Sequence, residues 1–163
     1  MNSSSETTSG KRANNTGNQL ERYVEDALMR HGYTRFPDHK KQLFANRDAV
    51  GGKQYGRHIF VGKTIYKGDR YVDFLILGSK KFPTGLIIEC KWQQSPGSVD
   101  EKYPFLLFNI LETGVETIVL LDGKGYKKEA KQWLVDHAGE TRALVAVYDM
   151  MEFQKAVNDD LLG

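Results

Sequence analysis

Two charged residues end an apolar run in the segment Leu86–Lys91, and this segment limits the folds open to the chain. Its periodicity places the strand in the centre of a sheet. Side chains alternate along a strand, so Glu89 and Lys91 share one face while Cys90 points to the other. A buried carboxylate or ammonium group must be paired, bind a metal or give up its charge. The sheet must therefore supply partners for Glu89 and Lys91.

Two further β-rich runs precede this strand and predict an antiparallel meander. They are His58–Tyr66 and Tyr71–Leu77, separated by residues 67–70, which have the composition of a hairpin turn. The strand over residues 85–91 is the third of the meander. Helices and strands then alternate, with predicted bounds of 98–112, 116–121, 125–137, 143–148 and 150–161. This alternation implies parallel pairing, so we expect an α/β fold with a central mixed sheet of about five strands flanked by helices.

The first half of the chain is more uneven. Apolar residues at helical spacing predict a helix over about 18–31, which ends at Gly32. Residues 33–56 show no sustained period and predict irregular structure. Ser98 is the expected N-cap of the helix over 98–112, because Glu101 stands three positions later, as in a capping box.

Composition predicts one domain in a reducing compartment. The 163 residues fit a single domain, which we assign to residues 18–163, after a flexible polar tail over residues 1–17. Cys90 is the only cysteine, so an intrachain disulfide is impossible. No segment resembles a signal peptide or reaches the ~20 apolar residues that cross a bilayer, so we expect a cytoplasmic protein that is not bound to a membrane.

A third charged residue, Asp73, lies in the strand before Glu89 and Lys91. If the two strands pair, Asp73 stands beside Glu89. Two converging carboxylates repel unless a cation lies between them, and hard oxygen ligands suit Mg²⁺, with Mn²⁺ as a substitute. Lys91 beside such a metal can orient or deprotonate a water molecule, as phosphodiester hydrolysis requires. The alternative is a partly buried ion-pair network without a metal.

This arrangement resembles the signature of the PD-(D/E)xK nuclease superfamily. Asp73 and the sequence Glu89-x-Lys91 carry the resemblance, with Val72 in place of the proline in the family name. By order of elements the resemblance extends over about residues 17–148. It implies a restriction-endonuclease-like fold, with Asp73, Glu89 and the backbone carbonyl of Cys90 as metal ligands.

The resemblance also implies accessory residues. The family places a glutamate on a helix ahead of the meander, where Glu21 is the matching catalytic position and Glu25, one turn later, is the alternative. Gln93, or Gln94, resembles a glutamine near the site, which we expect to touch the water shell of the metal. The helix after the Glu-x-Lys strand backs the active site in this family, so Lys102 is a candidate phosphate contact.

The expected partner is DNA. A net charge of +2 does not establish this by itself, but lysines cluster after residue 123 and form either a DNA contact or a solvated helix face. The candidate DNA-binding residues are Lys102, Lys124, Lys127 and Lys128. We expect a Mg²⁺-dependent DNA endonuclease of restriction or phage type, encoded by a bacterium or phage and forming a homodimer. The alternatives are a junction resolvase or repair nuclease, a DNA-binding or assembly subunit of a larger nuclease, and an RNA-directed enzyme.

Overall fold

A six-stranded mixed sheet forms the centre of the computed structural model, which describes residues 8–37, 42–97 and 100–163. The strands lie side by side in chain order: β1 (Thr34–Arg35), β2 (Gln54–Lys63), β3 (Asp69–Leu77), β4 (Leu86–Trp92), β5 (Thr117–Asp122) and β6 (Leu144–Tyr148). Strands β2, β3 and β4 form the predicted antiparallel meander. Strands β5 and β6 continue it in parallel, as the alternation of helices and strands predicted.

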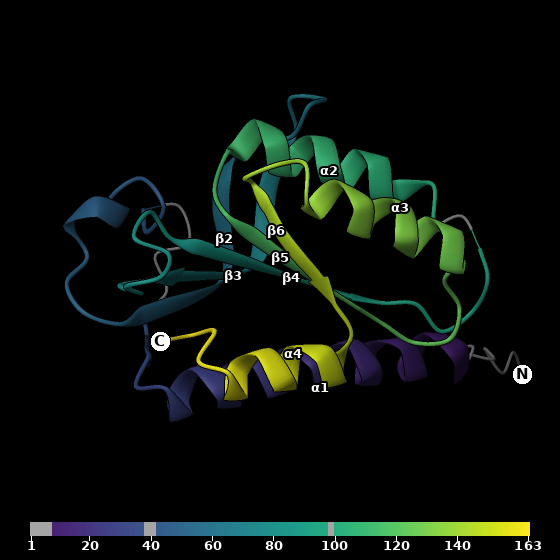
Figure 1. Cartoon of the computed structure of the whole chain (residues 1–163), viewed down its shortest axis with the longest axis horizontal. Helices are drawn as coiled ribbons and strands as arrows, with labels where there is room; N and C mark the ends of the chain where they lie inside the picture. The colour runs from purple at the N-terminus through teal and green to yellow at the C-terminus, as the bar shows by residue number, and fades with distance from the viewer. Residues whose placement is uncertain (1–7, 38–41, 98–99) are drawn as a thin grey trace, which may run out of the picture.

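Helices cover both faces of this sheet. Helices α1 and α4 lie against one face, and α2 and α3 lie against the other (Figure 1). Their bounds are α1 (Thr8–Arg30), α2 (Lys102–Thr113), α3 (Lys128–Ala138) and α4 (Met150–Asn158), with a short 3-10 helix at Arg47–Ala49. In the described ranges, no helix combines the length and the apolar character needed to cross a membrane.

The predicted α/β class is confirmed, but the sheet has six strands instead of about five. The additional strand is β1, whose two residues pair in parallel with the start of β2. It lies in the stretch over residues 33–56 that was predicted to be irregular. A strand of two residues is too short to show an alternating pattern, which explains why periodicity does not reveal it.

Helix α1 begins earlier than its apolar pattern indicates. It starts at Thr8, so residues 8–17, predicted as part of a flexible tail, are helical. Once a helix has nucleated, each added residue gains a backbone hydrogen bond without needing an apolar side chain. Residues 1–7 of the predicted tail lie outside the described residues. At the other end, Gly32 has the expected left-handed conformation, with φ of +81°.

The start of α2 also differs from its prediction. Ser98, the expected N-cap, lies outside the described residues, and α2 starts at Lys102 with Glu101 as its N-cap residue. Pro104 therefore occupies the first turn, where its missing N–H removes no hydrogen bond within the helix.

Strand β4 is buried on both faces, as a central strand should be. Ile88 packs with Val24, Phe74 and Phe153 in the core on the α1 and α4 side. Ile87 points to the opposite face, and both isoleucines have 0% exposure. Burying each of these side chains contributes roughly 1.5–3 kcal/mol. The residues that follow them on β4 are thus held in a fixed position.

Candidate active site

Strands β3 and β4 separate near Asp73. Their ladder pairs Ile76 with Leu86 and ends where Phe74 pairs with Ile88. Beyond that point, the Asp73 carboxylate accepts a hydrogen bond from the backbone N–H of Cys90, with Oδ2 and N 2.7 Å apart. The Asp73 side chain thus takes the place of a strand-to-strand backbone bond. This contact fixes the carboxylate beside the end of β4.

The other neighbour of Asp73 is distorted as well. On β2, Arg57 pairs with Phe74 and Ile59 pairs with Val72, so His58 lies opposite Asp73. His58 has φ of +51°, in the left-handed region that residues other than glycine seldom adopt. Backbone strain of this kind often accompanies functional sites. The irregular backbone at His58 therefore adjoins the predicted catalytic carboxylate.

The structure brings Asp73, Glu89 and Lys91 together. Lys91 Nζ lies 3.0 Å from Glu89 Oε2 and 3.7 Å from Asp73 Oδ2. Burial opposes the charge on Lys91, but the two carboxylates outweigh it and raise the lysine pKa above its ordinary value. Lys91 is therefore protonated at neutral pH. The predicted convergence of the two carboxylates is present, with an ammonium group between them.

Arg70 is a member of this cluster that the sequence analysis missed. Its Nη2 donates to Glu89 Oε1 at 3.1 Å, and both side chains are only 5% exposed. Its Nη1 donates to the backbone carbonyl of Asn109 at 2.7 Å and to the hydroxyl of Thr113, both on α2. Burial lowers the pKa of Arg70, although Glu89 opposes that effect. Arg70 thus anchors Glu89 to α2.

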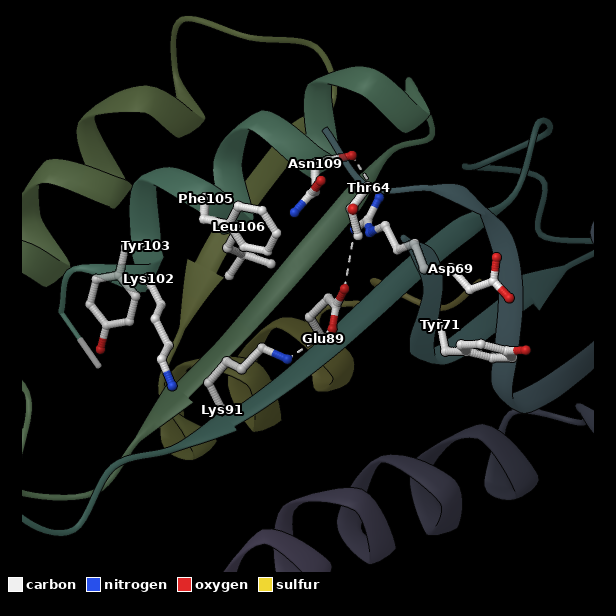
Figure 2. Close-up of a pocket in the computed structure, with 11 residues that line it drawn as sticks. Thr64, Asp69, Tyr71, Glu89, Lys91, Lys102, Tyr103, Phe105, Leu106 and Asn109 are labelled. Atoms are coloured by element: carbon white, nitrogen blue, oxygen red, sulfur yellow. Dashed lines mark hydrogen bonds and ion pairs between the residues drawn. The ribbon is translucent and has the colours of Figure 1, made fainter. Parts of the chain in front are cut away.

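Glu89 and Lys91 line a pocket of about 430 Å³ between the sheet and α2. Figure 2 shows these two side chains pointing toward each other from β4, with Phe105 above them on α2. Lys102, the candidate phosphate contact, also lines this pocket. The predicted DNA-binding residues Lys124, Lys127 and Lys128 are exposed in the turn after β5 and at the start of α3, and do not line it.

Gln93 has a packing role that the sequence did not reveal. It is 3% exposed, and its Oε1 accepts a hydrogen bond from the Tyr103 hydroxyl at 2.8 Å. Its Nε2 donates to the carbonyl of Gly125 at 3.1 Å. No hydrogen bond joins Gln93 to Asp73, Glu89 or Lys91 in the described part of the chain. Gln93 instead ties the end of β4 to α2 and to the turn after β5.

That turn requires glycine at two positions. A Cβ atom at Gly123 would lie 2.1 Å from the carbonyl oxygen of Gln93, and one at Gly125 would lie 2.4 Å from the backbone nitrogen of Ser95. Both distances are shorter than any van der Waals contact. The glycines therefore allow close packing of the turn against the end of β4.

Glu21 lies on α1, apart from the cluster at Lys91. Its carboxylate pairs with Arg57, and no hydrogen bond or ion pair among the described residues joins it to Asp73, Glu89 or Lys91. Its charge nevertheless acts on β4: burial, then Asp73 and then Glu21 raise the pKa of the Cys90 thiol well above its ordinary value.

Glu25, the alternative to Glu21, is held by contacts with the neighbouring strands. Its Oε1 accepts a hydrogen bond from the Tyr55 hydroxyl at 2.8 Å, and its Oε2 pairs with Arg57 at 3.1 Å. Arg35 lies 3.7 Å from Oε1. With three partners on β1 and β2, Glu25 has the contacts of a structural ion pair. Of the two glutamates, Glu21 is the better candidate for an accessory acid.

The donor set fits a hard cation that keeps part of its water shell. In the described ranges there is no group of three or more His, Cys, Asp and Glu side chains that could enclose a metal. Two carboxylates do converge, at Asp73 and Glu89, and Mg²⁺ is commonly held by one or two carboxylates together with water. The ammonium group of Lys91 contacts both carboxylates and marks the point at which they converge.

The comparison with known families agrees with this geometry. A family model described as a PD-(D/E)XK nuclease superfamily domain matches residues 12–161, which include all six strands and helices α2 to α4. No curated protein and no solved structure matches the chain. The mixed sheet with helices on both faces is consistent with a restriction-endonuclease-like fold. The chain belongs to the PD-(D/E)XK nuclease superfamily.

Proposed function

We propose that this protein is a Mg²⁺-dependent endonuclease that hydrolyses phosphodiester bonds in DNA. The observation that carries the proposal is the convergence of Asp73 and Glu89 on the Lys91 ammonium group, at 3.7 and 3.0 Å, beside an open pocket. The cluster contains a second cation, Arg70, which binds the other oxygen of Glu89. Because of this second contact, Glu89 keeps a counter-charge when Lys91 turns toward a substrate.

Each residue of the cluster has a distinct task in this proposal. Asp73, Glu89 and the backbone carbonyl of Cys90 would hold the metal, with Mn²⁺ as a substitute for Mg²⁺. When bound, the cation stabilises negative charge on the phosphoryl oxygens and helps to activate water. Lys91 donates hydrogen bonds to the attacking water or to a phosphate oxygen. Arg70 holds the Glu89 carboxylate in position.

Substrate contacts extend away from this cluster. Lys102, which lines the pocket, would bind a phosphate next to the one that is cleaved. Lys124, Lys127 and Lys128 form an exposed basic group that would contact the DNA backbone further along. The described residues form one such site per chain, so cleavage of both strands of a duplex would use a homodimer.

A specific observation favours a structure-directed nuclease as the second candidate, beside one of restriction or phage type. Reading a duplex sequence depends on polar side chains that reach base edges. The pocket beside Glu89 combines its polar and charged side chains with aromatic and aliphatic ones, including Tyr71, Phe105 and Leu106. These surfaces suit the faces of bases better than their edges.

Labelled oligonucleotides and supercoiled plasmid, incubated with the purified protein and Mg²⁺ or EDTA, test the proposal. We expect Mg²⁺-dependent products from the wild type and none from Asp73→Asn or Lys91→Ala. Lys81→Ala is the matched control. Lys81 lies in the turn between β3 and β4 and forms an exposed ion pair with Asp160, which follows α4. This control should cleave at the wild-type rate.

Circular dichroism should confirm that every variant is folded. Undiminished cleavage by Lys91→Ala, or cleavage that persists in EDTA, would contradict the proposed mechanism. Cleavage of RNA but not of DNA would show that the substrate is RNA. DNA binding by the folded wild type without cleavage under any metal would support a binding or assembly subunit instead.

A further inference from the structure

Two aromatic rings stack on each other beside the proposed active site. Tyr66, in the turn between β2 and β3, and Phe105, on α2, have ring centroids 5.1 Å apart and planes inclined by 26°. Tyr66 is 79% exposed, whereas Phe105 also lines the pocket that contains Glu89 and Lys91. The Tyr66 ring therefore contributes little to the core and faces solvent next to the site.

A third aromatic residue lines the same pocket. Tyr71, on β3, is 45% exposed and is held by an edge contact with Phe60, with centroids 5.6 Å apart. In Figure 2, Tyr71 and Phe105 lie on either side of Glu89. Aromatic faces thus flank the carboxylate that we propose binds the metal.

Positive charge accompanies these rings. Lys102 lies three residues before Phe105 on α2, which places both on one side of the helix, and both line the pocket. Lys91 supplies a second ammonium group at the floor. An exposed ring beside lysines combines the two contacts that proteins make with single-stranded nucleic acid, namely stacking on bases and ion pairing with phosphates.

We propose that Tyr66 and Phe105 form a stacking surface for an unpaired nucleobase next to the cleaved phosphate. This inference rests on the proposed nuclease function and names its substrate class as single-stranded, frayed or flapped nucleic acid. Bases inside an intact duplex have both faces covered by their neighbours. Such a base would have to leave the helix before it could stack on Tyr66.

The competing occupant of this surface is another protein molecule. Phe108 and Leu111 on α2 are 55% and 40% exposed, so the apolar surface extends along the helix. The lysines decide in favour of nucleic acid, because Lys91 and Lys102 line the same pocket as Phe105 and match the phosphates of a strand. The experiment must therefore distinguish binding of nucleic acid at Tyr66 from a protein interface there.

Fluorescence anisotropy in EDTA, which prevents metal-dependent cleavage, tests this inference. The probes are a labelled single strand, the same strand with abasic sites, and a blunt duplex of the same sequence. We expect Tyr66→Ala to weaken binding of the single strand by roughly five- to a hundredfold, as stacking of one base predicts. The abasic strand and the blunt duplex should bind this variant and the wild type equally.

Two further variants make the result specific. Tyr66→Phe keeps the ring and should bind the single strand within about twofold of the wild type. Met151→Ala removes a side chain of similar exposure, 81%, from α4 on the opposite face of the sheet and should change nothing. Equal loss on single strand and duplex, or no loss on the single strand, would overturn the inference. So would a change in sedimentation of Tyr66→Ala without a change in binding.

Cleavage measured in parallel separates this inference from the function on which it rests. If the wild type cleaves in a manner that depends on Mg²⁺ and Lys91, and Tyr66→Ala binds and cleaves single strands normally, only the stacking surface is refuted. If the wild type binds single strands through Tyr66 but never cleaves them, the nuclease function is refuted while the stacking surface stands.

Discussion

Arg70 and Glu89 form a buried ion pair, with Nη2 and Oε1 3.1 Å apart and both side chains 5% exposed. Because Arg70 also donates to the carbonyl of Asn109, the pair connects strand β4 to helix α2. It occupies one oxygen of Glu89 and leaves the other, Oε2, facing Lys91. Arg70 therefore determines which carboxylate oxygen is presented to the proposed metal.

Replacement of Arg70 by alanine should strongly destabilise the protein. Removing one partner of a buried pair leaves an uncompensated charge and costs about 3–5 kcal/mol. Urea denaturation followed by circular dichroism measures the loss. Lys81→Ala, which breaks an exposed pair with Asp160, should cost no more than about 1 kcal/mol. Equal losses of unfolding free energy in the two variants would show that the buried Arg70 pair stabilises the protein no more than an exposed pair does.

The sequence predicted the parts of the fold and the site that depend on local patterns. Alternation within a short apolar strand is enough to place Glu89 and Lys91 on one face, and the order of three strands brings Asp73 beside them. Helix α1 before residue 18 was not predictable in this way, because its added turns show no apolar periodicity.

Contacts between distant residues were beyond such patterns. Arg70 was assigned to a hairpin turn, and its partners on α2 lie 39 and 43 residues away. The available signal was its position directly before an apolar strand that contains Asp73. Gln93 is the opposite case, a residue that local sequence placed at the site and the structure does not. It follows the Glu-x-Lys motif closely, which suggested a contact with the metal's water. Packing turns its amide toward Tyr103 instead.

Lys91→Ala should make the stability of the protein more dependent on Mg²⁺. Without the ammonium group, Asp73 and Glu89 lose a shared counter-charge, so a divalent cation gains more by binding between them. We expect Mg²⁺ to raise the melting temperature of Lys91→Ala more than that of the wild type, following the linkage between binding and stability. Asp73→Asn should show the smallest shift. Identical shifts in all three proteins would argue against a metal at these carboxylates.

Replacing Glu21 and replacing Glu25 should have different effects on stability and activity. Glu25 has contacts with Tyr55, Arg57 and Arg35, so Glu25→Gln should destabilise the protein by roughly 1–3 kcal/mol. Glu21→Gln should cost less than Glu25→Gln, yet reduce Mg²⁺-dependent cleavage more. Denaturation midpoints and initial rates, measured on the same preparations, make the comparison. The reverse ranking in activity would assign the accessory role to Glu25.

Tyr103→Phe should test the packing role of Gln93. The variant keeps the ring but removes the hydroxyl that donates to Gln93 Oε1 at 2.8 Å, leaving a buried acceptor without its donor. The cost should be roughly 1–3 kcal/mol in the free energy of unfolding. Tyr71→Phe removes a hydroxyl from a residue that is 45% exposed and should have little effect. Similar stabilities for these two variants would mean that the Gln93 contact contributes little.

The protein should lose stability in alkaline solution between about pH 10 and pH 12 because of two buried phenols. Burial raises the pKa of Tyr103 to about 12, and burial together with Glu25 raises the pKa of Tyr55 to about 12. A phenol whose pKa is higher in the folded state retains its proton longer there. Its stabilising contribution is therefore complete below the unfolded pKa of about 10 and is lost as the pH rises through 12. Absorbance at 295 nm should show these two phenols ionising late, and Tyr103→Phe should remove one of them. Full ionisation of Tyr103 near pH 10 while circular dichroism still reports a folded protein would contradict its burial.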